Sequence, residues 1–331
     1  MKPDVDFPEQ YSMLALAESF YLTQILLALD ATGVLATLRT PASAEQLAGR
    51  HRLDPRFLEA ALRMLAQRTP FLRFQRGKYN LTGRYDSGAR AVFHQYLGAY
   101  RTNAVELAAI LRDPSIAEGF VNRQEHARAF ERTQTLSATV LIDLIIQLGL
   151  NHVLDLGCGT GGMLLELAER NPRFEGWGVD FNPWMCAAAR RQVKAGAARP
   201  RIRILRGDCR DLATTIPKTI LRRVRTITAA SLANEFCGDD GASTVAWLAG
   251  LKSTFPGRTL LISDYYGRLG GRRKRWKPNI ALHDFAQLIS GQGIPPPDLA
   301  AWKKIYRRAD CAMVHAIEDR ASSFFAHVIK L

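Results

Sequence analysis

The stretch VLDLGCGTGG, residues 153–162, constrains the fold of this 331-residue chain more than any other. Its first half predicts a buried strand, Val153 to Leu156, that runs directly into a glycine-rich turn and a helix from about Met163 to Arg170. Because glycine has no Cβ, such a turn bends tightly and approaches a bound molecule closely. The glycines that do so here are Gly157, Gly159 and Gly161. Asp180 ends the next predicted strand, where a carboxylate can accept hydrogen bonds from both hydroxyls of a ribose, so the pattern predicts a βαβ unit that binds a nucleoside.

Two kinds of ligand fit this turn, because Gly157, Gly159 and Gly162 also satisfy the dinucleotide fingerprint GxGxxG. Asp155 favours one of them, since a carboxylate at this place repels a pyrophosphate and attracts a ligand with a positively charged amino-acid end. The run DLGCGTG resembles the first motif of the class I S-adenosylmethionine (SAM)-dependent methyltransferases, and the resemblance covers residues 130–331. It implies an α/β fold with a Rossmann-like doubly wound sheet, and SAM as the cofactor. A nicotinamide-dependent enzyme and a glycine turn without a ligand are the alternatives.

Composition and charge bear on location and partners. No stretch resembles an apolar span of about 18 residues or a signal peptide, so we expect a soluble, cytoplasmic protein without a membrane partner. The five cysteines are widely spaced and predict reduced thiols instead of a disulfide framework or a zinc site. Of the net charge of +14, most lies in residues 146–331, which hold 28 Lys and Arg against 16 Asp and Glu. The basic run RLGGRRKRWK, residues 268–277, predicts a solvated surface or a site for an acidic substrate or carrier protein.

The N-terminal region, residues 1–84, has the pattern of a winged-helix domain. Residues 12–36 carry large apolar side chains at helical spacing on every side, so this helix requires a partner. Ser43 and Gln46 form a capping box for a short helix, and Asp54-Pro55 opens another that runs to about Gln67. The segments FLRFQ and YNLT flank the turn Arg76-Gly77-Lys78 and predict a hairpin.

This pattern resembles the N-terminal dimerisation domain of small-molecule O-methyltransferases, which implies a homodimer. A winged helix is also compatible with DNA binding, and Arg52, Arg56 and Arg63 favour that alternative. Residues 1–145 hold 17 Lys and Arg against 15 Asp and Glu, however, and a DNA-binding domain at the N-terminus would concentrate its positive charge there. We therefore do not expect DNA to be a partner.

Residues 85–145 are predicted to form a mostly helical connector. In the enzymes that this chain resembles, the connector crosses over the SAM pocket and lines the acceptor site. The resemblance thus gives five candidates for substrate contact, although exposure on a helix surface or core packing is the simpler explanation for each of them. They are Tyr96, Tyr100, Arg101, Asn103 and Arg128.

Residues 146–331 are predicted to form the SAM-binding, Rossmann-like catalytic domain, because strands and helices alternate along them. Ligands in such sheets bind outside the carboxyl ends of the strands, where Asp155, Asp180, Asp208 and Asn234 all fall. Asp208 matches the methyltransferase position whose carboxylate accepts from the adenine amino group, and Phe181 is placed to pack on the adenine face. A helix N-cap is the alternative role for Asp208.

The segment SLANEFCGDDG departs from the resembled family. Small-molecule O-methyltransferases usually have Leu-His-Asp-Trp at the end of the fourth strand, and its His takes the proton of the acceptor hydroxyl. Here Asn234 takes the place of that His and Glu235 the place of the Asp. Asn is no base at neutral pH, whereas Glu235 becomes one if burial raises its pKa. His283, in the predicted helix 281–289, is the other candidate base. Some 2-oxo-acid C-methyltransferases of this fold hold an iron with one histidine from each of these two regions. Because this chain has Asn234 in the first region and His283 in the second, we expect no metal.

The sequence thus predicts a SAM-dependent methyltransferase that acts on a small molecule of specialised, natural-product metabolism. The missing His shifts the expected acceptor atom towards carbon or nitrogen, with His283 as the candidate base. A hydroxyl or an enolisable carbon requires a deprotonating group, whereas an amine does not. A methyltransferase-like SAM cyclase, which forms azetidine-2-carboxylate and methylthioadenosine, would keep the SAM motifs and lose the base as well. A winged-helix DNA-binding regulator is the third hypothesis.

Overall fold

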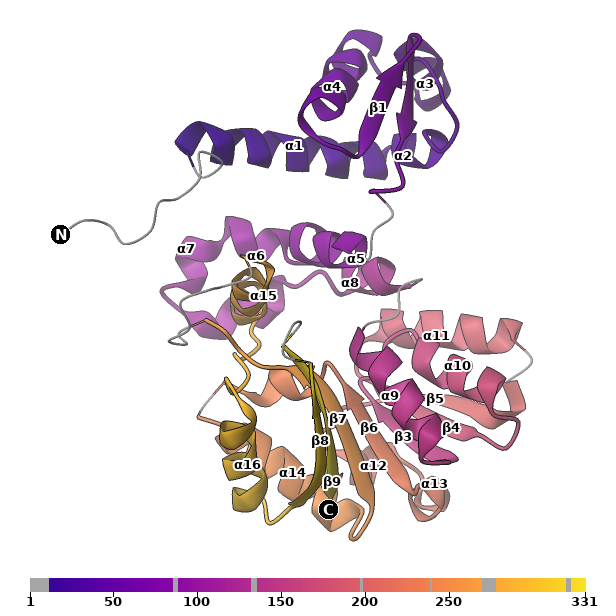
Figure 1. Ribbon diagram of the computed structural model, residues 1–331, viewed down its shortest axis with the longest axis vertical. Coiled ribbons are helices and arrows are strands. Elements are labelled where there is room, and N and C mark those ends of the chain that lie inside the picture. The colour runs from indigo at the N-terminus through magenta and orange to yellow at the C-terminus, as the bar shows by residue number, and fades with distance from the viewer. Residues whose placement is uncertain are drawn as a thin grey trace, which may run out of the picture. The chain divides into compact units, whose positions relative to one another are not determined.

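The computed structural model describes residues 12–85, 89–131, 136–196, 199–238, 240–269, 278–319 and 323–331. The chain divides into two compact units, Met1–Gly98 and Ala99–Leu331. Figure 1 shows the elements of both along the chain.

The first unit is a bundle of short helices with a two-stranded hairpin. Its elements are α1 (Met13–Ala31), α2 (Val34–Thr37), α3 (Ala44–His51), α4 (Pro55–Arg68), β1 (Leu72–Gln75), β2 (Lys78–Leu81), α5 (Ala89–His94) and the π-helical turn η2 (Gln95–Ala99), which crosses into the second unit. Leu38, Leu47, Leu62 and Leu65 lie at the centre of its core, with exposed fractions of at most 2%. These buried leucines recur at helical spacing in α4, which explains why the helix packs on one face.

The predicted local signals of this unit are confirmed. Ser43 and Gln46 form the capping box of α3, and the Asp54 carboxylate accepts hydrogen bonds from the backbone at the start of α4. Arg76 and Gly77 join β1 to β2, and both have positive φ angles, as tight hairpin turns require. The single helix expected over residues 12–36 is wrong, because α1 ends at Ala31 and Gly33, at φ +76°, separates it from α2.

Helix α1 is the most apolar exposed element of the first unit. By length and composition it could cross a membrane, which corrects the expectation that no such span exists, and 11% of its most apolar window is buried. Met13 and Leu14 are more than four-fifths exposed, and Phe20 and Tyr21 are about three-fifths exposed. An exposed apolar surface of this kind on a single chain indicates an interaction site.

The second unit contains a seven-stranded sheet in the order β5-β4-β3-β6-β7-β9-β8. The strands are β3 (His152–Leu156), β4 (Glu175–Asp180), β5 (Ile202–Arg206), β6 (Thr226–Ala230), β7 (Thr259–Tyr265), β8 (Ala312–Glu318) and β9 (Phe324–Lys330). Strands β3 to β7 are parallel, while β9 is antiparallel to β7 and to β8. The predicted α/β doubly wound fold is confirmed.

Helices cover both faces of this sheet. One face carries α9 (Leu136–Gln147), α10 (Gly162–Arg170) and α11 (Pro183–Ala195), and the other carries α12 (Leu212–Thr215), α13 (Lys218–Arg223), α14 (Ala242–Thr254) and α16 (Leu299–Arg308), as Figure 1 shows. Because β3 lies between β4 and β6, the strand order reverses beside β3, and this switch point is where such sheets bind ligands.

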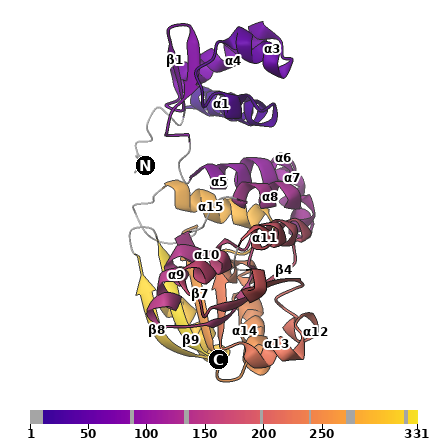
Figure 2. The same cartoon turned by 90° about the vertical axis from the view of Figure 1, so that its right-hand side faces the viewer.

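A helical layer lies beyond the carboxyl ends of the parallel strands. It consists of α6 (Arg101–Val105), α7 (Leu107–Ile110), the 3₁₀ helix η3 (Pro114–Phe120), α8 (Arg123–Phe130) and α15 (Pro278–Ile289), and Figure 2 shows α6, α7, α8 and α15 side by side. The Asn103 amide ties this layer together, since it donates to the carbonyls of Ala117 and Ile289 at 2.6 and 2.8 Å. The layer therefore covers the edge of the sheet at which the predicted ligand residues end.

Candidate functional site

The glycine turn after β3 has the backbone conformation that the sequence predicts. Gly157, Gly159 and Gly161 have φ angles of +63°, +53° and +80°, which L side chains rarely adopt. Space is short as well, because a Cβ on Gly157 would lie 3.0 Å from the Leu232 side chain. The turn therefore brings its backbone to the switch point of the sheet without side chains at the three glycine positions.

Asp180 connects this turn to the end of β4. Its two carboxylate oxygens accept hydrogen bonds from the backbone N–H groups of Gly159, at 2.9 Å, and Asn182, at 2.8 Å. Burial raises the pKa of Asp180, while these two hydrogen bonds act in the opposite direction. Since an ionised carboxylate has about four acceptor sites, the two that remain suit the paired hydroxyls of a ribose.

Asp155 lies at the centre of the sheet, on β3. It is buried, and its carboxylate accepts a hydrogen bond of 2.8 Å from the Thr228 hydroxyl on β6. Burial raises its pKa to about 7, and the nearby Asp180 charge adds to the effect. A positively charged amine bound at the turn would reverse this shift and ionise Asp155, because opposite charges stabilise each other in a buried site.

A cavity of about 100 Å³ lies where β4, β5 and β6 end, beneath the helical layer. Its lining combines residues after those strand ends with residues of the layer: Tyr100, Glu118, Val121, Arg123, Phe181, Asp208, Cys209, Arg210, Glu235, Ser290, Gly291 and Gln292. This volume is below the roughly 300 Å³ at which pockets for small molecules begin, so the cavity alone accommodates only part of a ligand.

Phe181 and Arg123 face each other in this cavity. The Arg123 guanidinium lies 4.6 Å from the centroid of the Phe181 ring and pairs with the Glu118 carboxylate at 2.7 Å. The Asn182 amide fixes the backbone beneath it by donating to the Arg123 carbonyl at 3.1 Å. Arg123 thus occupies a face of the ring on which a ligand base would otherwise stack.

Asp208 also lines the cavity, but its side chain is half exposed. One carboxylate oxygen accepts from the Arg210 backbone N–H at 2.8 Å, and the other lies 3.6 Å from the Arg210 guanidinium. The helix N-cap role that we considered for Asp208 is wrong, because α12 begins after Asp211.

Asn234, Gln292 and Glu235 form a chain of hydrogen bonds at the end of β6. The Asn234 amide nitrogen donates to the Gln292 side-chain oxygen at 3.1 Å, and the Gln292 amide nitrogen donates to the Glu235 carboxylate at 3.3 Å. Asp264, on the neighbouring β7, accepts from the Asn234 backbone N–H at 3.1 Å. Within the described part of the chain, the buried Oδ1 of Asn234 has no hydrogen-bond partner.

The two candidate bases differ in their surroundings. Burial, followed by the charge of Asp180, raises the pKa of Glu235 to about 7, while Arg123 and Arg210 oppose that shift. Burial lowers the pKa of His283, on α15, to about 4. Its ring packs edge-on against Tyr265 at 4.4 Å, and it is not among the residues that line the cavity.

The five connector candidates are placed very differently. Tyr100 lines the cavity, and its hydroxyl donates to the Gln287 side chain on α15 at 3.2 Å. Asn103 is fully buried and its amide nitrogen holds the helical layer together, while Arg101 is exposed on α6. Arg128 pairs with Glu125 on the surface of α8, and Tyr96 belongs to the first unit.

Glu118, Arg123 and Gln292 also line the cavity, and none of them is predicted from the sequence. Nothing in their local patterns distinguishes them, because they reach the cavity through the packing of the helical layer on strand ends far away in the sequence. The basic run at residues 268–277 lies outside the described residues except for Arg268 and Leu269. In the described ranges, no group of three His, Cys, Asp or Glu residues is placed to hold a metal ion.

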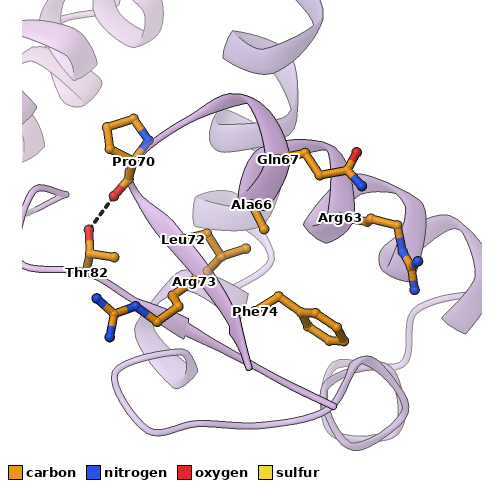
Figure 3. Close-up of a pocket in the computed structure, with 8 residues that line it drawn as sticks. All are labelled: Arg63, Ala66, Gln67, Pro70, Leu72, Arg73, Phe74 and Thr82. Carbon is orange, nitrogen blue, oxygen red and sulfur yellow. Dashed lines mark hydrogen bonds between the residues drawn. The ribbon is translucent and has the colours of Figure 1, made fainter. Parts of the chain in front are cut away.

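The first unit has a hollow of its own, of about 410 Å³, between α4 and the hairpin. Figure 3 shows Arg63 and Phe74 on one side of β1 and Arg73 on the other, with the hydrogen bond from Thr82 to Pro70 closing one end. Arg63 lies 5.9 Å from the Phe74 ring and pairs with Glu59. Arg63 and Thr82 of this hollow thus have partners within the first unit.

Comparison with known proteins agrees with the geometry of the second unit. Residues 153–230 match the family model described as "Methyltransferase domain". Demethylmenaquinone methyltransferase of Thermus thermophilus is 43% identical over 67 residues, which are 20% of this chain and 30% of that protein. Methyltransferase UngE' of Aspergillus campestris is 25% identical over 181 residues, 52% of this chain and 51% of that protein. The chain therefore spans about half or less of the length of these curated relatives.

Solved structures resemble the chain over nearly its whole length, at low identity. An O-methyltransferase family protein from Burkholderia thailandensis has a TM-score of 0.72 at 16% identity and covers 98% of both chains. PigF with SAH has a TM-score of 0.75 at 16% identity, covering 98% of this chain and 100% of that one. Human N-acetylserotonin methyltransferase in complex with SAM has a TM-score of 0.71 at 16% identity, covering 100% and 99%.

The fold and the matched domain define the class. The sheet order, the left-handed glycine turn and the Asp180 carboxylate that contacts it make the second unit a class I methyltransferase fold. Residues 153–230, which contain the glycine turn and Asp180, are the part of the chain that matches a methyltransferase domain.

Proposed function

We propose that this protein is a SAM-dependent methyltransferase that methylates a small molecule of specialised metabolism at carbon or nitrogen. The observation that carries the acceptor part of the proposal is the fully buried Asn234, which stands where a base would take the proton of a hydroxyl acceptor. An amide holds an acceptor without competing for its proton. Mitomycin 7-O-methyltransferase MmcR, at a TM-score of 0.73 and 14% identity, shows that the fold serves natural-product methylation.

The residues of the site fit SAM as it would lie across the switch point. The turn at Gly157 to Gly161 and Asp155 would hold its amino-acid end, Asp180 its ribose, and Phe181 and Asp208 its adenine. SAM supplies a methyl group on a sulfonium, which is electrophilic without further activation. The protein's task is then to align the acceptor and exclude water, and such alignment supplies several kcal/mol or more of the barrier reduction.

Asn234 gives the acceptor a hydrogen-bonding partner. Gln292 occupies its amide nitrogen, so the carbonyl Oδ1 is the atom that remains. A buried carbonyl without a partner costs about 1–3 kcal/mol, and an N–H or O–H group of the acceptor would remove that cost. We therefore propose that Asn234 positions the acceptor, and that the acceptor carries a hydrogen-bond donor.

Proton removal, where the acceptor needs it, falls to His283 or Glu235. With its pKa lowered to about 4 by burial, His283 is neutral at physiological pH and is a weak base. An amine that binds in its neutral form attacks the methyl group without prior loss of a proton, whereas a phenol must be deprotonated first. The connector residues Tyr96, Tyr100, Arg101, Asn103 and Arg128 remain proposals for the acceptor site, with Tyr100 supported by its place in the cavity.

We further propose that residues 1–84 form a winged-helix dimerisation domain, that residues 85–145 connect it to the catalytic domain at 146–331, and that the protein is a cytoplasmic homodimer. The support is the exposed apolar surface of α1, which a second copy of the chain would cover. The five cysteines are free thiols in the structure, which agrees with a reducing compartment.

Mass spectrometry of the purified protein incubated with SAM distinguishes this proposal from its rivals. We expect S-adenosylhomocysteine (SAH) to form only when an acceptor is added, with amines and enolisable carbons tested beside phenols. Methylthioadenosine formed from SAM alone would instead establish the cyclase, since the amine of SAM would then displace methylthioadenosine from the same molecule. Retarded migration of duplex DNA with the protein, without turnover of SAM, would favour the regulator.

A further inference from the structure

We propose that Glu235, as a neutral carboxylic acid, binds the Watson–Crick edge of the adenine of SAM, an inference that rests on the SAM site proposed above. The acid O–H would donate to adenine N1, and the acid carbonyl would accept from the 6-amino group. Glu235 is then an adenine-binding residue and not the general base.

The placement of the adenine follows from the chain itself. Asp180, which would hold the ribose, is followed directly by Phe181, whose ring lines the cavity. A base attached to that ribose enters the cavity beside Phe181. Glu235 and Gln292 line the same cavity and present the groups able to pair with an edge of a base.

The charge of Glu235 decides whether this pairing is possible. Adenine presents an acceptor, N1, beside a donor, the amino group. An ionised carboxylate would place one of its oxygens, an acceptor, against N1, which is also an acceptor. A protonated carboxyl has one donor and one acceptor and matches the edge at both positions. Gln292 fits this arrangement, because its amide nitrogen donates to Oε1 of Glu235, which identifies Oε1 as the carbonyl and leaves Oε2 for the proton.

The surroundings of Glu235 favour the neutral form. Carboxylates and a thiol face Glu235 from three sides: Asp180 after β4, Asp208 and Cys209 after β5, and Glu118 from η3. Two positive charges also face it, those of Arg123 from α8 and Arg210. The two arginines have carboxylate partners of their own, since Arg123 pairs with Glu118 and Arg210 lies 3.6 Å from Asp208. Burial then outweighs their attraction and raises the pKa of Glu235 to about 7.

The sequence-based candidate for the adenine amino group, Asp208, is less suited to this role. Its carboxylate is half exposed and engaged by the backbone and guanidinium of Arg210. It accepts from the amino group at most and has no proton for N1, so Glu235 adds the contact that Asp208 cannot make.

The test is calorimetric titration of the full-length protein with SAH at about pH 6 and about pH 8.5. Because binding requires the protonated acid, the affinity of the wild type should fall by about thirty-fold across this range if the pKa is near 7. Glu235→Gln, whose amide imitates the neutral acid, should bind SAH about as tightly as the wild type at low pH and lose the pH dependence. Glu235→Leu should bind weakly at both values, and Glu169→Gln, an exposed glutamate on α10, should behave as the wild type.

The outcomes separate this inference from the function on which it rests. A pH dependence that is the same in the wild type and in Glu235→Gln would overturn it, because Asp155 and the amine of SAH titrate in both proteins. Affinity that is unchanged in Glu235→Leu at low pH would overturn it as well. No SAH binding by the wild type at either pH would instead contradict the proposed methyltransferase function itself.

Discussion

Asp180 links the fold of the glycine turn to ligand binding. Its carboxylate accepts from the Gly159 backbone and would accept from the ribose on its remaining lone pairs. We expect Asp180→Ala to weaken SAH binding about 10- to 150-fold, because losing one partner of a charge-assisted hydrogen bond costs about 1.5–3 kcal/mol. Calorimetry measures this, with Asp143→Ala, at an exposed aspartate that pairs with Arg170, as the control. Equal affinities of wild type and Asp180→Ala would remove the ribose assignment.

Asn234 is the residue at which the proposed mechanism departs from that of the O-methyltransferases that the sequence resembles. If its free Oδ1 positions the acceptor, Asn234→Ala and Asn234→His should both reduce turnover of the native acceptor, while SAH affinity changes by less than about two-fold. SAH formation followed by mass spectrometry gives the turnover, and calorimetry gives the affinity. If Asn234→His instead gained activity on phenols that the wild type leaves unmodified and kept its native turnover, the positioning role would be refuted.

At this scale, the sequence predicts the residues whose role depends on local spacing. The three glycines and Asp180 are found because a turn and the next strand place them within about thirty residues of one another. Gln292 is not, because its contact with Asn234 crosses 58 residues and depends on how α15 ends above the sheet. Asp208 lies just after a strand, as predicted. Its contact with Arg210 depends on the conformation of both side chains, which sequence spacing does not determine.

At the scale of elements, the segment η3–α8 closes the cavity. Arg123 lies on the Phe181 face where the adenine would stack, and both residues line the cavity of about 100 Å³. The segment must therefore shift, or the Arg123 side chain must swing away, before the ligand enters.

We expect Arg123→Ala to raise SAH affinity about two- to five-fold, because a cation–π contact of about 0.5–1 kcal/mol no longer opposes entry. The backbone contact with Asn182 is retained in this variant, so the segment keeps its position. Arg112→Ala, which removes an exposed arginine close to η3, is the control, and calorimetry is the measurement. Weaker binding in Arg123→Ala would show that the guanidinium holds the ligand and does not exclude it.

The elements themselves follow well from sequence wherever a cap or a turn signal marks them. The capping box at Ser43, the Asp54 cap and the Arg76-Gly77 turn all lie where the pattern places them. The N-terminal helix was predicted too long, because its apolar residues continue past Gly33 while the backbone there turns left-handed. The spacing of apolar residues predicts which side chains are buried, but it does not predict where the helix ends, which depends on the left-handed backbone of Gly33.

At the scale of the whole molecule, the proposed dimer depends on α1. Its exposed apolar residues include Leu16 and Phe20, and a permanent dimer typically buries about 2,000 Å² or more. We expect the wild type to be a dimer at micromolar concentration, and the double variant Leu16→Glu, Phe20→Glu to be a monomer, since buried charges without partners prevent association. Light scattering after size-exclusion chromatography measures both, and Phe57→Glu, at an exposed position of α4, is the control. A wild-type monomer would contradict the proposed homodimer.

The alternation of strands and helices predicts the doubly wound sheet, because parallel strands need helical crossovers that cover both faces. It does not predict what the helical layer does to the site. The layer brings residues 100–130 next to residues 278–292, and both segments line the same cavity. Because these segments lie far apart along the chain, no sequence pattern predicts that they share a cavity. For the same reason the acceptor is less determined by sequence than the methyl donor, whose contacts begin within one βαβ unit.

The most direct test of the account uses SAM with an isotopically labelled methyl group. The purified protein is incubated with it and with small-molecule acceptors that carry an amine, an enolisable carbon or a phenol, and mass spectrometry follows the label. We expect SAH in equal amount to a product labelled at nitrogen or carbon, with both reduced in Asp180→Ala at SAM concentrations that do not saturate that variant. Label found in methylthioadenosine, with no labelled product and no SAH, would contradict it.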